Sequence, residues 1–328
     1  MTYNRAGTSG LKLPAVSLGF WHNFGDITPF DQMKSLVFTA FDNGITHFDL
    51  ANNYGPEPGA AEKNAGRLIR QYLAAHRDEL VISTKAGYEM WSGPYGDWGS
   101  RKYLLASLDQ SLERLGLDYV DIFYHHRPDP ETPLEETMGA LAQAVASGKA
   151  LYVGLSNYDG PQLSGRRRSS MNCTCRSSST RTNTTIFDRT VERNGLKDTA
   201  KHLGKGLITF CPLAQGLLTG KYRKGQPLPA GSRATWQSDH QINDLLTDEN
   251  LDKVEQLRKV ADELGTNLPV LSMAWILQHP EISCVIAGAS KPSQLENNMK
   301  AAGFVIPADA MAEIDKITGF HRFERHVG

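Results

Sequence analysis

Four side chains that can move or stabilise protons stand where apolar runs of the sequence end. Asp49, Lys85 and the pair His125–His126 each follow directly on such a run, and Tyr54 lies shortly after Asp49. If the runs are neighbouring parallel strands, their ends meet at one rim. A carboxylate, a phenol, an ammonium and an imidazole gathered there form a proton-transfer site.

Tyrosine is a poor acid at neutral pH, since its ordinary pKa is about 10, unless a nearby cation stabilises its phenolate. Lys85 can supply that cation, Asp49 can hold the ammonium, and His126 can orient a carbonyl oxygen. For each residue alone the alternative is a surface ion pair or a cap. Four such residues on successive runs favour catalysis. Adjacent strand residues point apart, so only one of the two histidines is expected to face the site.

The elements that must position these residues alternate between strand and helix. Strands are expected at 15–19, 47–50, 80–85, 119–124, 152–155, 207–211 and 284–287, with an eighth between 157 and 207. Helical periodicity covers 31–43, 60–75, 101–115, 134–147, 196–203, 252–264 and 292–302, with two extra amphipathic helices at 268–277 and 308–317. This pattern predicts an α/β fold, a (β/α)8 TIM barrel formed by residues 1–328 as one domain, with an N-terminal β-hairpin and extra C-terminal helices.

Composition narrows the function further. A net charge of -1 gives no basic field for nucleic acid or for an anionic membrane. No apolar run approaches the roughly 20 residues that span a bilayer, which favours a cytoplasmic protein. Cys173 and Cys175 have no second pair beside them, so no metal is expected. The partner is then a small molecule, and the oligomeric state stays open, a homo-oligomer included.

Several of these motifs resemble the aldo-keto reductase family. They are FDLANNYG at 48–55, STK at 83–85, GLSN at 154–157, and GAS at 288–290 with Gln294 and Asn298 behind it. The resemblance implies that Tyr54 is the general acid, and the step from Asp121 selects His126 over His125. Further stretches, AGYEMW at 86–91, GPYG at 93–96 and PLAQGLLTGK at 212–221, resemble the bacterial L-glyceraldehyde 3-phosphate reductase branch, which is related to potassium-channel β subunits.

The implied activity is reduction of small aldehydes or ketones to alcohols, L-glyceraldehyde 3-phosphate among them, by hydride transfer from NADPH. The alternative is a regulatory or scaffold barrel that binds the cofactor without significant turnover. The sequence has no Gly-x-Gly-x-x-Gly opening a βα unit, so a barrel phosphate site after the last strands is expected instead. Lys291 can pair a 2′-phosphate, which favours NADPH.

The resemblance places sixteen residues at the cofactor, with Ser156 and Asn157 on the nicotinamide amide and Phe210 against its ring. The full set is Trp21, Ser156, Asn157, Phe210, Pro212, Leu213, Gln215, Gly216, Leu218, Lys221, Gly288, Ser290, Lys291, Gln294, Asn297 and Asn298. Aromatic residues in βα loops can wall an apolar pocket. The substrate-pocket candidates are Trp21, Met90, Trp91, Tyr95 and Arg127, with loop packing, or an ion pair of Arg127 with Asp129 or Glu131, as the alternatives.

One segment, 165–185, does not fit the barrel. It reads GRRRSSMNCTCRSSSTRTNTT and has neither strand nor helix periodicity where a helix and a strand belong. A codon frame shifted by one base can yield AAEILDELHVPFVLNQDEYN, which restores both elements, so we hypothesise a frame error that puts Arg181 in the place of a nicotinamide-binding Gln. A functional basic loop is the alternative. As written, the segment is expected to leave an open barrel edge and to impair folding or activity.

Overall fold

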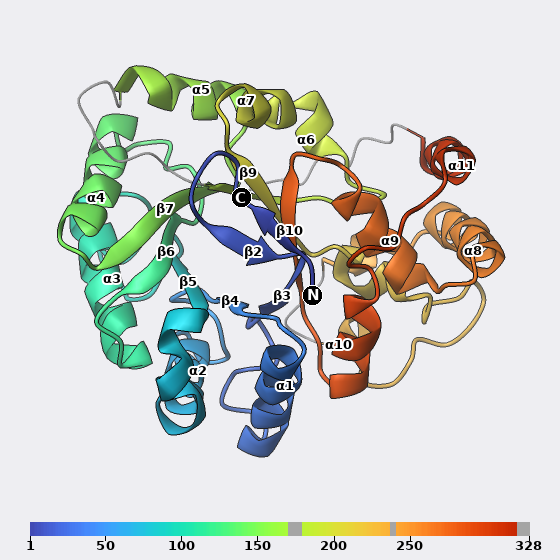
Figure 1. Ribbon diagram of the computed structural model, residues 1–328, viewed down its shortest axis with the longest axis horizontal. Helices are drawn as coiled ribbons and strands as arrows, with labels where there is room; N and C mark the ends of the chain where they lie inside the picture. Colours follow the sequence, from blue (N-terminus) through green and yellow to red (C-terminus); the bar gives the residue numbers. More distant parts are fainter. Residues whose placement is uncertain (170–178, 237–240, 320–328) are drawn as a thin grey trace.

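Eight parallel strands close into a barrel at the centre of the molecule (Figure 1). The computed structural model describes residues 1–169, 179–236 and 241–319. The strands run in the closed order β10-β3-β4-β5-β6-β7-β8-β9. They are β3 (Val16–Gly19), β4 (His47–Asp49), β5 (Val81–Ala86), β6 (Val120–His125), β7 (Ala150–Ser156), β8 (Ser179–Asn183), β9 (Gly206–Phe210) and β10 (Ile282–Ala287). The predicted TIM barrel is confirmed.

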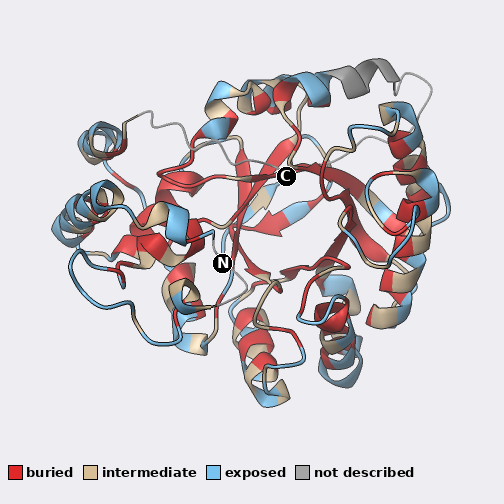
Figure 2. Ribbon diagram, turned by 180° about the vertical axis from the view of Figure 1, so that it is seen from behind, coloured by how far each residue is buried: buried red, intermediate tan, exposed pale blue. Residues whose placement is uncertain are grey.

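Helices surround the barrel and bury its outer face, so that red strands and red inner helix faces dominate Figure 2. Strands covered on both sides read as continuous apolar runs, which is why the sequence revealed them. The helices are α1 (Phe30–Asp42), α2 (Ala60–Leu68), α3 (Arg101–Leu115), α4 (Leu134–Ala146), α5 (Gly160–Ser169), α6 (Thr190–Arg193), α7 (Leu196–His202), α8 (Asp248–Glu263), α9 (Leu268–Leu277), α10 (Pro292–Met299) and α11 (Ala308–Thr318).

The two helices α8 and α9 exchange the roles that periodicity gave them. α9, expected to be an added amphipathic helix, is buried on nearly every side and packs against β10. α8 is amphipathic and packs on α11 and α9 instead. α9 is therefore the barrel helix before the last strand, and α8 is the addition.

The N-terminal hairpin closes the floor of the barrel as expected. β1 (Tyr3–Arg5) pairs antiparallel with β2 (Lys12–Pro14), and Leu13 packs inside the barrel with Ile208 and Cys284. The turn presses so closely on the start of β9 that a Cβ at Gly7 would lie 2.2 Å from the carbonyl oxygen of Gly204. The opposite end of the barrel is thus left for the site.

The expectation of an open edge at 165–185 is wrong. Ser179–Asn183 form β8, which pairs with β7 on one side and β9 on the other. Backbone hydrogen bonds to β7 and β9 hold this polar strand between them. α5 precedes β8 in the chain. Cys173, Cys175 and most of the basic run lie outside the described residues or have undescribed side chains. The frame hypothesis stays a prediction about the gene.

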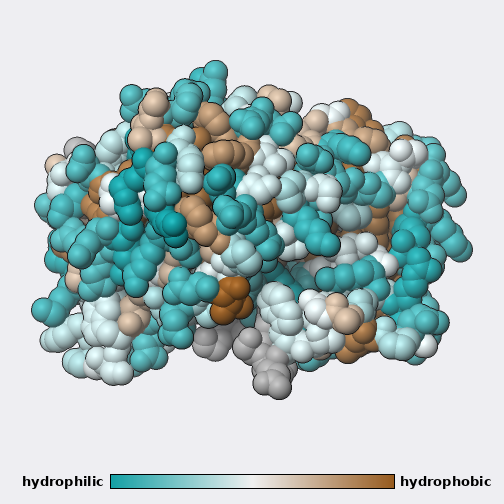
Figure 3. Space-filling view, turned by 90° about the horizontal axis from the view of Figure 1, so that it is seen from below, coloured by the Kyte–Doolittle hydropathy of each residue, from teal (hydrophilic) through white to brown (hydrophobic). Residues whose placement is uncertain are grey.

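The outer surface is ordinary for such a barrel. On the face shown in Figure 3, hydrophilic side chains prevail and apolar ones are scattered. None of the helices in the three described ranges combines the length and the apolar character needed to cross a membrane.

Candidate active site

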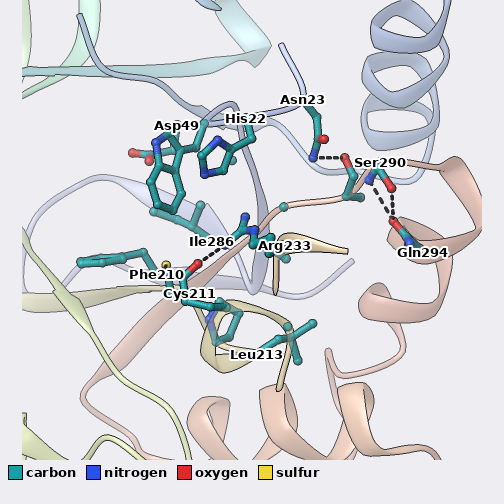
Figure 4. Close-up of a pocket in the computed structure, with 18 of the residues that line it drawn as sticks. His22, Asn23, Asp49, Phe210, Cys211, Leu213, Arg233, Ile286, Ser290 and Gln294 are labelled. Carbon is teal, nitrogen blue, oxygen red and sulfur yellow. Dashed lines mark hydrogen bonds between the residues drawn. The ribbon is translucent and has the colours of Figure 1, made fainter. Parts of the chain in front are cut away.

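A cavity of about 650 Å³ opens at the carboxyl ends of the strands (Figure 4). Its wall includes Gly19, Asp49, Phe210 and Ala287, which end β3, β4, β9 and β10. This is the end of the barrel where loops, rather than the strand packing, decide which side chains converge.

The structure brings Asp49, Tyr54, Lys85 and His126 together at the inner end of this cavity. The Lys85 ammonium lies 2.8 Å from Oδ2 of Asp49 and also donates to the carbonyl oxygen of Leu50. The same ammonium is 5.0 Å from the centre of the Tyr54 ring, and the ring of His126 stands edge-on to Tyr54 at 6.0 Å between centroids. All four side chains are buried.

Burial dominates the electrostatics here. It lowers the pKa of Lys85 to about 7, against the opposing effect of Asp49. It raises the pKa of Tyr54, with Arg181 as the strongest opposing charge. Burial would also raise the pKa of Asp49, but Lys85 and Arg181 together hold it below its usual value. Asp49 is therefore a stable anion, and the cation that touches the phenol is Arg181.

A buried polar chain holds the second oxygen of Asp49. The Ser83 hydroxyl donates to Oδ1 of Asp49 at 2.9 Å and lies 3.0 Å from Nε2 of His47, whose Nδ1 lies 2.9 Å from the hydroxyl of Ser17. Burial lowers the pKa of His47 to about 4, so the ring is neutral. A proton on its Nε2 then donates to Ser83 and fixes the direction of the whole chain. The sequence pattern does not reveal this chain of hydrogen bonds because its residues lie inside strands that otherwise have the pattern of buried core.

The two adjacent histidines point apart, as the strand geometry requires. His126 lines the cavity and meets the ring of Tyr88 at 4.7 Å. His125 turns outward, and its Nδ1 lies 2.7 Å from the hydroxyl of Tyr158. Burial lowers the pKa of both rings, so each is neutral at physiological pH. Only His126 is positioned to meet a substrate.

Most residues expected at the cofactor line the same cavity. They are Trp21, Asn157, Phe210, Pro212, Leu213, Gln215, Gly216, Lys221, Gly288, Ser290, Gln294, Asn297 and Asn298. Ser156, Leu218 and Lys291 lie outside this lining. Ser156 and Leu218 are buried in the adjoining structure, whereas Lys291 is exposed at the N-cap of α10.

The outer end of the cavity is built around the start of α10. The backbone N–H and the hydroxyl of Ser290 both contact Oε1 of Gln294, at 2.8 and 3.0 Å. Asn23 donates to the carbonyl oxygen of Ala289 and fixes this loop (Figure 4). The N-terminus of a helix presents backbone N–H groups that suit an anion such as a phosphate.

The substrate-pocket candidates are placed differently from the prediction. Of the five, only Trp21 lines the cavity. Met90 and Trp91 face a separate hollow beside α3, and Tyr95 is half exposed. These side chains are turned aside because residues 87–99 fold back toward α3, where Trp91 packs 5.3 Å from Tyr103.

Arg127 serves the fold of this loop rather than the cavity. Its guanidinium donates to both carboxylate oxygens of Asp97, at 3.0 and 2.9 Å, and to the carbonyl oxygen of Gly87. It also stacks 3.6 Å above the ring of Trp98. The alternative for Arg127, an ion pair, is thus observed, with Asp97 as the partner.

Other residues that line the cavity were not found from the sequence. They include His22, Asn23, Tyr88, Cys211, Arg233, Trp236 and Gln241, whereas Arg181, which also lines the cavity, stands where the resemblance expects a nicotinamide-binding Gln. Arg233 and Trp236 come from the irregular connection between β9 and α8, where Arg233 binds Oε1 of Gln215 and lies 5.2 Å from the ring of Trp21. Irregular backbone has no periodicity, so the sequence held no signal for them.

The (β/α)8 barrel and the group of ionisable residues in its cavity are typical of an enzyme, and comparison with known families identifies which one. The aldo/keto reductase family model matches residues 15–318, and the chain belongs to this family. It is 48% identical to the L-glyceraldehyde 3-phosphate reductase of Escherichia coli strain K12 over 321 residues, 96% of this chain and 92% of that protein. It is 38% identical to a probable voltage-gated potassium channel subunit beta of Arabidopsis thaliana, with 97% and 95% covered.

Proposed function

We propose that this protein reduces small aldehydes or ketones to alcohols with NADPH, with Tyr54 as the general acid. Membership in the aldo/keto reductase family supports an oxidoreductase. The observation that carries the proposal is the meeting of Tyr54, Lys85, Asp49 and His126 at the inner end of one cavity. Triose phosphate is one candidate substrate, because an E. coli relative is named for it.

The hydrogen bonds around Tyr54 prepare its proton for transfer. Arg181 donates to the phenol oxygen from 3.2 Å, so the proton of Tyr54 itself remains available to a carbonyl oxygen in the cavity. Donation to the oxygen also stabilises the phenolate left behind. His126, neutral and beside the phenol, can donate a second hydrogen bond to the same carbonyl oxygen.

The residues present fit a nicotinamide cofactor, which supplies a hydride when bound. The buried hydroxyl of Ser156 makes no hydrogen bond to any described residue, and an amide next to Asn157 would satisfy it. The aromatic face of Phe210 lies in the same wall. Ser290 and the start of α10 suit phosphate, and the exposed Lys291 at the N-cap of this helix can pair a 2′-phosphate, which supports NADPH over NADH.

The test measures transfer of deuterium from the cofactor to the product, in addition to the change in absorbance of NADPH. Purified protein is incubated with NADPH carrying deuterium at C4, prepared as each of the two C4 epimers in turn, and with a panel of small aldehydes. The proposal expects that one epimer gives an alcohol with one deuterium on the former carbonyl carbon. Binding of NADPH with no deuterated alcohol from either epimer would contradict it and would favour the cofactor-binding regulatory barrel.

A further inference from the structure

One cation in the cavity, Arg181, enters the function proposed above only through its hydrogen bond to Tyr54, although the resemblance puts it in the place of a nicotinamide-binding Gln. Arg181 projects from β8 into the barrel, with 4% of the residue exposed. Its Nη2 lies 3.3 Å from Oδ2 of Asp49 and 3.2 Å from the Tyr54 hydroxyl. Its guanidinium carbon stands 4.0 Å from the centre of the Phe210 ring. The side chain is thus held rigidly at the reacting end.

The charges around it do not balance. Asp49 is the one carboxylate that forms an ion pair with either Arg181 or Lys85 among the described residues. Glu62, another buried carboxylate, is engaged by Arg114 and Thr84. An arginine stays charged in a protein, so Asp49 is shared by two basic groups, and the end of the cavity carries an excess of positive charge below the pKa of Lys85, about 7, where Lys85 is protonated as well.

The guanidinium also has donors to spare. Its Nε is buried and has no hydrogen-bond partner in the described part of the chain. Leaving a buried donor of a charged group unpaired is costly, and a planar oxyanion that accepts from two guanidinium nitrogens removes that cost. Arg181 lines the cavity, so an anion bound there lies beside the guanidinium.

We propose that Arg181 forms an anion subsite directly beside Tyr54, so that the preferred substrate is a 2-oxo acid, with a carboxylate on the carbon next to the carbonyl. The inference rests on the proposed function. Tyr54 fixes where the carbonyl oxygen lies, and Arg181 touches that same hydroxyl. A carboxylate on the adjacent carbon reaches the remaining guanidinium donors, whereas the phosphate of a triose phosphate is separated from the carbonyl by further carbons.

The turnover test compares pyruvate with its neutral methyl ester, which keeps the same ketone. The wild type should prefer pyruvate to the ester more strongly than Arg181→Gln does. The ratio of kcat/KM for pyruvate to kcat/KM for the ester should therefore fall at least about 10-fold in that variant. Arg181→Lys, which keeps the charge but loses the planar fork, should fall between the two. Arg5→Gln, in the hairpin at the opposite end of the barrel, removes an exposed cation remote from the cavity and should leave the ratio as in the wild type.

A binding test separates this inference from the proposed function. Oxamate resembles a 2-oxo acid but is not reduced, and its affinity can be measured by calorimetry whether or not the protein turns over. Its Kd should rise at least about 10-fold in Arg181→Gln and stay unchanged in Arg5→Gln. Equal oxamate binding by wild type and Arg181→Gln would overturn the subsite. Oxamate binding that depends on Arg181 without reduction of any carbonyl would retain the subsite and contradict the reductase.

Discussion

The hydroxyl of Ser83 lies 2.9 Å from Oδ1 of Asp49, on the side of the carboxylate that neither Lys85 nor Arg181 occupies. The carboxylate is therefore held by cations through one oxygen and by a neutral chain through the other. The hydrogen bond from Ser83, inside the barrel below the floor of the cavity, sets the orientation of the Asp49 carboxylate. Asp49 in turn positions the ammonium of Lys85.

Ser83→Ala tests this positioning. It leaves Oδ1 of Asp49 and Nε2 of His47 without their partner, so stability should fall by about 1–3 kcal/mol. We expect kcat to fall about 10-fold with KM nearly unchanged, because Ser83 does not line the cavity. Ser83→Thr, which keeps the hydroxyl, should recover most of the rate. A variant with lower stability but wild-type kcat would show that the chain is only structural.

The lowered pKa of Lys85 predicts a pH dependence of stability. Burial brings this pKa from 10.5 to about 7, so between these values the unfolded chain binds a proton that the folded chain does not. The contribution of Lys85 to the free energy of unfolding should therefore increase as the pH rises from about 7 to 10.5. Lys85→Met removes the contribution, and its urea unfolding should change less between about pH 7.5 and about pH 9.5. Equal changes in both proteins would contradict the shift.

Arg181 also predicts a bias between the two redox forms of the cofactor. Oxidised nicotinamide carries a positive charge, and a buried guanidinium at the reacting end repels it. Arg181→Gln, which supplies the residue that the shifted codon frame would encode, should tighten binding of NADP⁺ relative to NADPH by about 10-fold. Fluorescence titration with each form measures the ratio, and Arg5→Gln, outside the cavity, is the matched control. If Arg181→Gln leaves the ratio of the Kd values for NADP⁺ and NADPH unchanged, repulsion between Arg181 and the oxidised nicotinamide is contradicted.

The polar strand β8 should be improvable. Thr180 faces the helices beside Leu155 and Leu207, and its hydroxyl is buried without a hydrogen-bond partner in the described ranges. Thr180→Val replaces the hydroxyl by a methyl group of similar size, so the free energy of unfolding should rise by about 1 kcal/mol. Thr182→Val, where the hydroxyl has an acceptor in Asn183, should gain less. Thermal unfolding of both variants decides the point.

The sequence was sufficient to predict residues positioned by buried parallel strands. It was not sufficient for a strand held in place by its neighbours or for residues in irregular loops. Asp49, Lys85 and His126 could be placed because each follows an apolar strand whose register sets its direction. β8 could not, since Ser179–Asn183 are polar and are held by the strands on either side. Trp91 and Arg127 were misplaced, and Arg233 was missed, because the irregular loops that carry them fold according to contacts that no periodicity encodes.

The phenol of Tyr54 is the proton donor of the proposed reduction, and one variant tests this role directly. Tyr54→Phe removes the hydroxyl and keeps the ring beside Trp21 and His126. NADPH should still bind with a Kd close to that of the wild type, while kcat for carbonyl reduction should fall by about 10²–10⁴-fold. Carbonyl reduction by Tyr54→Phe at the wild-type rate would contradict the assignment of this site.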